Sequence, residues 1–71
     1  MSSLAEALPA EITRVRDVQD QFKELRKLPN VIVEPQIAMM EASIQEGMNA
    51  LASGDVVRML RAHEDLKGWK E

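Results

Sequence analysis

The sequence predicts an all-α domain in which two long antiparallel helices form a hairpin and a short third helix packs across them, assembled as a homo-oligomer. Apolar residues recur every three or four positions through most of the chain, as on one face of an α-helix. Three Pro and three Gly residues punctuate these periodic segments. A chain of 71 residues forms at most one small domain, whose apolar burial barely offsets the entropy lost on ordering. A second subunit is therefore expected to supply missing core.

The first helix is expected over residues 9–28. Pro9 suits the first turn of a helix, where its missing N–H costs nothing, and Pro29 ends the helix. Ser3 and Glu6 fit a capping box, which predicts a short leading turn before it. Its apolar face is expected to comprise Ile12, Val15, Gln19, Phe22 and Leu25.

Residues 29–35 are expected to form an extended connector. The segment is rich in β-branched residues and has Pro at both ends, which disfavours helix. Two interpretations stay open: a hydrophobic strap over the helices, or an edge that pairs with a second subunit.

The second helix is expected over residues 36–53. Its apolar stripe repeats with the spacing of a coiled-coil seam, and Gly47 on that stripe permits close approach of another backbone. Residues 29–54 hold three Glu and no Lys or Arg, so this stretch carries the whole net charge of −3. The predicted oligomer interface comprises Ile37, Met40, Ile44, Gly47, Met48 and Leu51.

The third helix is expected over residues 56–67. Gly54 suits the left-handed end of the preceding helix and Asp55 the N-cap of this one. Trp69, just beyond Gly68, is expected to fold back on His63. The inward positions are predicted to be Val56, Met59, Leu60, His63 and Leu66.

No catalytic or metal-binding arrangement is evident. The chain has no Cys, and its single His, His63, has no motif that ties it to a hydroxyl nucleophile or a second metal ligand. We therefore expect that the protein is not an enzyme and that it binds no cofactor and no metal.

The net negative charge argues against binding to duplex nucleic acid, and no apolar run approaches the roughly 20 residues that span a bilayer. The chain is expected to be cytoplasmic.

The basic side chains allow two interpretations. They either lie on solvated faces in local ion pairs, or symmetry brings equivalent clusters together into a basic cleft for a small anionic ligand. His63 is either a packing residue against Trp69 or a ligand. The candidate ligand-binding residues are Arg14, Arg16, Lys23, Arg58, Arg61 and His63.

Residues 37–51 resemble the central helix of the small phage anti-CBASS proteins. That helix has an apolar-Ala start followed by an aliphatic-Gln-x-Gly-hydrophobic-x-Ala-Leu run. A weaker likeness lies in residues 8–12, and residues 53–68 look like short prophage-encoded proteins. The matching positions in the helix are Ala38, Ile44, Gln45, Gly47, Met48, Ala50 and Leu51.

The resemblance implies a compact helical oligomer, encoded by a phage and acting in its bacterial host. Proteins of the anti-CBASS family sequester cyclic oligonucleotide immune signals without cleaving them. The expected function is thus non-catalytic, stoichiometric sequestration of a cyclic dinucleotide or trinucleotide, as an anti-defence sponge. The alternative is a protein–protein interaction module that inhibits or adapts a host or phage protein through its acidic, Met-rich helix.

Overall fold

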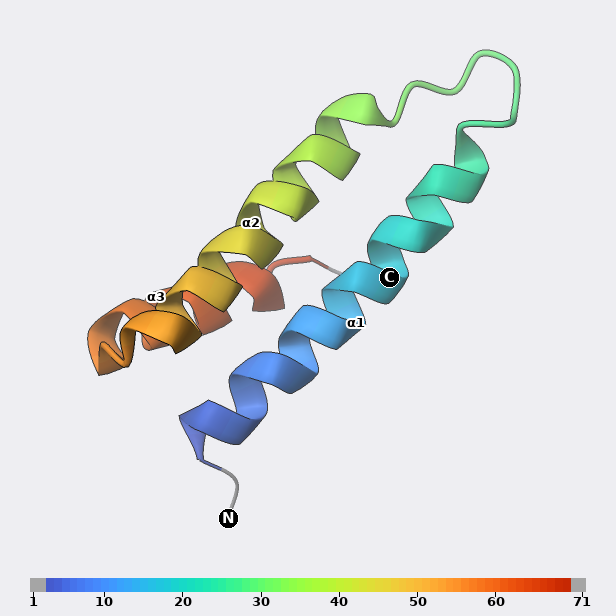
Figure 1. Ribbon diagram of the computed structural model, residues 1–71. Coiled ribbons are helices and arrows are strands. Elements are labelled where there is room, and N and C mark those ends of the chain that lie inside the picture. The colour runs from blue at the N-terminus through green and yellow to red at the C-terminus, as the bar shows by residue number, and fades with distance from the viewer. Residues whose placement is uncertain (1–2, 70–71) are drawn as a thin grey trace.

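The computed structural model describes residues 3–69, which form three helices: α1 (Leu4–Leu25), α2 (Glu34–Ser53) and α3 (Val56–Lys67). This described range contains no strand, so the predicted all-α class is confirmed. The two long helices lie side by side and are joined at one end by residues 26–33, while α3 packs against the other end of the pair (Figure 1). Each helix contacts both of the others.

The N-terminal helix is longer at its start and shorter at its end than predicted. It begins at Leu4, so Pro9 lies inside α1 rather than in its first turn. Ser3 takes the N-cap position, and its carbonyl accepts from two backbone amides, but its side chain makes no capping hydrogen bond. The predicted capping box is therefore absent. The helix ends at Leu25, because the residues before Pro29 turn away from helical geometry.

The connector lies three residues earlier at its start and two earlier at its end than predicted, because α1 ends at Leu25 and α2 begins at Glu34, with Pro35 in its first turn. Asn30 adopts a left-handed conformation, with φ of 65°, which Asn tolerates better than most residues. Val33 is buried while Ile32 points to solvent. Only one side of this β-branched segment thus covers the helices.

The junction between α2 and α3 follows the sequence prediction. Gly54 has a φ of 71° and donates its N–H to the carbonyl of Leu51. Oδ1 of Asp55 accepts from the amides of Val57 at 3.0 Å and Arg58 at 3.2 Å. The predicted bounds of this third helix, 56–67, match the structure.

The core lies where the three helices meet. Gly47 allows this approach, since a Cβ placed there would lie 3.2 Å from the Ile12 side chain and 3.3 Å from that of Leu66. The fully or almost fully buried apolar side chains of the core are Leu8, Val15, Val18, Met40, Ile44, Ala50, Met59, Ala62 and Leu66.

This core places the predicted oligomer seam inside a single chain. Met40 and Ile44 are fully buried against the chain's own helices, and the close approach expected at Gly47 is made by α1 and α3. Of the six residues assigned to a subunit interface, Met48 alone is exposed, and Ile37 and Leu51 are half-buried. The coiled-coil spacing therefore describes packing within the chain.

The inward face of α3 also differs from the prediction. Met59, Ala62 and Leu66 are buried, whereas Val56 and Leu60 are exposed. Successive helical residues point about 100° apart, so a stripe with the 59–62–66 spacing leaves Leu60 on the solvent side.

Trp69 folds back onto the helices and makes a hydrogen bond that the sequence did not predict. Its Nε1 donates to the Ser43 hydroxyl at 3.2 Å, and its ring packs on the core. Gly68 has a φ of −68°, so the helix ends without a left-handed glycine.

Candidate functional site

Arg14 and Arg16 on α1 are held by acceptors within the chain. Arg14 donates to Glu11 at 3.0 Å and to the carbonyl of Leu66 at 2.9 Å. That carbonyl belongs to the last turn of α3, where helices leave acceptors unsatisfied. Arg14 thus ties the end of α3 to α1, and its guanidinium is already engaged.

Arg16 belongs to a polar network that joins α1 to α2. It donates to Glu41 at 2.6 Å and to Gln19 at 3.0 Å. Gln19, almost fully buried, donates in turn to Glu41 at 3.0 Å and to the carbonyl of Ile37 at 3.2 Å. Gln45 also donates to Glu41, at 2.8 Å. Hydrogen bonds from Gln45, Gln19 and Arg16 lower the pKa of the Glu41 carboxyl from 4.5 to about 2.

Lys23 and His63 belong to neither of these arginine networks. Lys23 lies 3.9 Å from Asp20 on the surface of α1, a loose pair of the kind that solvent screens. His63 is half-buried and makes no hydrogen bond or ion pair within residues 3–69.

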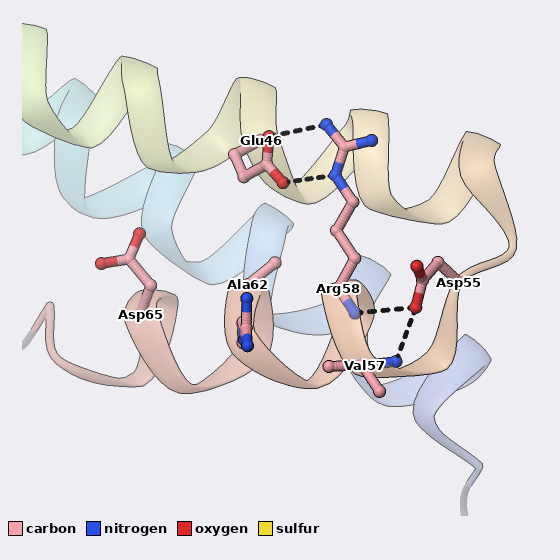
Figure 2. Close-up of a pocket in the computed structure, with 7 residues that line it drawn as sticks. Glu46, Asp55, Val57, Arg58, Ala62 and Asp65 are labelled. Carbon is pink, nitrogen blue, oxygen red and sulfur yellow. Dashed lines mark hydrogen bonds and ion pairs between the residues drawn. The ribbon is translucent and has the colours of Figure 1, made fainter.

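Arg58 and Arg61 are the two predicted residues that the fold brings into one site. They line a groove of about 530 Å³ between α2 and α3 (Figure 2). Arg58 crosses from α3 to Glu46 on α2 and forms a bidentate pair, with Nε and Nη2 donating at 2.7 Å and 2.9 Å. The Arg58 hydrogen bonds lower the pKa of Glu46, and Glu46 in turn raises the pKa of Arg58.

The remaining lining residues make the groove electrically mixed. Asp55 and Asp65 lie at opposite ends of it in Figure 2, and Val57 and Ala62 supply apolar surface. Three carboxylates therefore face two guanidinium groups. Arg61 makes no ion pair or hydrogen bond with any part of the described chain, so it is the cation that the groove leaves available.

The six predicted ligand residues thus do not converge within one chain. Arg14, Arg16 and Lys23 lie on α1 with their own acceptors, while the groove takes Arg58 and Arg61 from α3. Sequence reasoning missed the acidic lining residues Glu46, Asp55 and Asp65. The four-residue spacing from Arg61 to Asp65 indicates that these two residues are neighbours on the helix surface. The Glu46–Arg58 pair, in contrast, spans twelve residues and two helices, so no local spacing indicates it.

Residues 3–69 contain no group of three or more His, Cys, Asp or Glu side chains placed to hold a metal ion. None of the helices in this range is long and apolar enough to cross a membrane. Comparison of the chain with protein-family models, with curated proteins and with solved structures finds no match.

Proposed function

We propose that this protein is a small non-catalytic binding protein that acts by stoichiometric association with another polypeptide. One observation carries the proposal. Val56, Val57 and Leu60, here named the α3 apolar face, are 67%, 59% and 52% exposed on one side of α3. A contiguous apolar surface rimmed by polar residues is typical of a protein-interaction site.

The charges around the groove support a polypeptide partner. Arginine is enriched at protein interfaces, and a rim with both signs complements the mixed charges of a protein surface. A phosphate site needs an excess of cations or backbone amides, whereas this groove has three carboxylates to two guanidinium groups. Arg14, Arg16 and Arg58 already bind acceptors of the same chain.

In cellular terms, the proposal describes an inhibitor or adaptor of a host or phage protein in the bacterial cytoplasm, with the helical hairpin assembled as a homo-oligomer. The likeness of residues 53–68 to short prophage-encoded proteins supports such an accessory role. We assign the proposed binding surface to α3 rather than to the acidic α2. Two of the α2 carboxylates, Glu41 and Glu46, already pair with arginines of the chain itself.

Affinity recovery tests the proposal. The tagged full-length chain is expressed in bacteria together with an untagged copy, and recovered polypeptides are quantified. We expect one polypeptide at a fixed molar ratio with the wild type and its loss with Leu60→Glu. Met39→Glu is the matched control, since Met39 is a helical, exposed apolar residue outside the α3 apolar face. The proposal is contradicted if no polypeptide is recovered, or if the wild type and Leu60→Glu recover the same amount.

A second candidate function is sequestration of a cyclic nucleotide, favoured by Arg61, which lies beside Arg58 in the groove and makes no ion pair with another of the described residues. Calorimetric titration with cyclic dinucleotides and trinucleotides tests it. A sponge binds one of these saturably and releases it intact, and Arg61→Glu weakens the binding. Absence of heat with every nucleotide, at protein concentrations of tens of micromolar, eliminates this candidate.

A further inference from the structure

The α3 apolar face lies beside the groove, and Val57 belongs to both. Each chain therefore presents protruding aliphatic side chains next to a hollow of about 530 Å³. A two-fold interface requires a self-complementary surface of this kind, because the same patch serves on both subunits. In such a pair, the α3 apolar faces of the two copies pack against each other beside the two grooves.

The charges of α3 select the relative direction of two such helices. In a parallel pair, each residue lies level with its own copy, so Arg61 faces Arg61 and Asp55 faces Asp55. In an antiparallel pair, Arg61 of one copy, which makes no ion pair within residues 3–69, approaches the acidic start of α3 in the other. Antiparallel helices also place opposite ends of their macrodipoles together. Charge complementarity therefore favours the antiparallel arrangement.

We propose that a second copy of this chain covers the α3 apolar face, with the two α3 helices antiparallel and Val57 of each copy level with Leu60 of the other. This inference rests on the proposed function, because it names the polypeptide that the surface binds. In this register Arg61 lies level with Val56 of the second copy, one residue, or about 1.5 Å along the axis, from its Asp55. The capping bonds use Oδ1 of Asp55, which leaves Oδ2 to accept from Arg61.

The size of the face sets the strength of this dimer. Three exposed apolar side chains per copy are far fewer than the roughly 20 to 30 residues a side of a standard interface. We therefore expect a reversible dimer that exchanges with monomer, and whose population rises with concentration. Added salt is expected to weaken it, because the two Arg61–Asp55 pairs lie at the solvent-exposed rim.

Sedimentation equilibrium of the full-length chain tests the proposal from low micromolar to near-millimolar concentration. The average mass is expected to rise from the 8.0 kDa of one chain toward twice that value. Leu60→Glu is expected to abolish the rise, whereas Met39→Glu leaves it unchanged. Circular dichroism establishes that both variants are helical. A wild-type mass that stays monomeric at every concentration, or a Leu60→Glu mass that rises as the wild type does, overturns the proposal.

Cysteine cross-linking tests the register. The natural chain has no Cys, so an introduced pair reports without background. A mixture of Val57→Cys and Leu60→Cys chains under mild oxidation is expected to form a mixed disulfide much faster than Val57→Cys with Met39→Cys. Equal rates overturn the antiparallel register.

The affinity experiment separates this proposal from the one it rests on. Recovery of the untagged copy through Leu60 supports the dimer and stoichiometric binding through the α3 apolar face, and recovery of a host or phage protein with it supports the inhibitor or adaptor role. Recovery of a different protein through Leu60 by a chain that sediments as a monomer refutes the dimer and leaves the proposed function standing. A monomeric chain that recovers nothing refutes both.

Discussion

Gly47 provides the sharpest test of how the three helices pack, because two opposing effects meet at one position. Glycine in a helix interior costs about 1 kcal/mol relative to alanine, so Gly47→Ala gains that much from backbone propensity. The added Cβ would lie 3.2 Å from both Cδ1 and Cγ1 of Ile12, and 3.3 Å from Cδ1 of Leu66. These contacts are tighter than a packed methyl group makes, and overpacking of a core costs about 1–3 kcal/mol.

The balance depends on whether the neighbours can move. Ile12 carries the two closest atoms and packs against the core, and Leu66 is fully buried, so we expect Gly47→Ala to destabilise the protein by about 1 kcal/mol net. A domain of this length has a total free energy of unfolding of roughly 4–11 kcal/mol. In a domain of this size, a loss of about 1 kcal/mol lowers the Tm by about 4–8 °C.

A double-mutant cycle isolates the cause. Ile12→Ala removes both closer atoms, so Gly47→Ala introduced into that background is expected to become neutral or stabilising by up to about 1 kcal/mol. Urea unfolding followed by far-UV circular dichroism measures all four proteins at one concentration. A stabilising Gly47→Ala in the wild type, or the same change in stability in both backgrounds, would refute the packing argument.

Three further predictions concern single side chains. The pKa of Glu41 is lower in the folded protein, about 2 against 4.5, so its stabilising contribution is present above pH 4.5 and is lost as the pH falls toward 2. Since the carboxylate is 39% exposed, we expect about 1 kcal/mol, allowing for solvent screening; urea unfolding of the wild type and Glu41→Gln should converge over that pH range, and parallel curves would contradict this. Asp55→Ala removes both capping bonds at the start of α3 and should cost about 1 kcal/mol in the same assay, while Asp55→Asn retains most of the stability; an Asp55→Ala variant as stable as the wild type would show that the cap is unimportant. Leu66→Ala should cost about 2–5 kcal/mol in urea unfolding, whereas the exposed Leu25 should tolerate the same change within about 0.5 kcal/mol; equal losses at the two positions would contradict the assignment of Leu66 to the core.

Much of the local structure could be predicted because its causes lie within a few residues. The start of α3 follows from Gly54, which has no Cβ to oppose a left-handed conformation, and from Asp55, whose side chain caps the first amides of the helix. Pro9 shows the limit of such rules. A proline before a helical pattern reads as its start, but the leading turn continues straight through it into α1.

The candidate site was only half visible in the sequence. Arg58 and Arg61 stood out as a basic pair, but the carboxylate that binds Arg58 lies twelve residues away on another helix. Arg14 and Arg16 were equally plausible ligands until the fold brought them to Leu66 and Glu41. Ion pairs across helices depend on how the helices rotate against each other, and no local spacing specifies that rotation.

The sequence by itself determined that the chain is helical, where its punctuation lies and that α2 carries an apolar seam. Only the tertiary structure decided what that seam meets. The small size suggested that a second copy completes the core, yet Met40, Ile44 and Gly47 pack against helices of their own chain. The spacing of apolar residues identifies which face of a helix becomes buried, because this spacing is a property of the helix alone. The surface that receives it depends on where the other helices pack, and here α3 turned its core stripe to Met59, Ala62 and Leu66 and left Val56, Val57 and Leu60 outside.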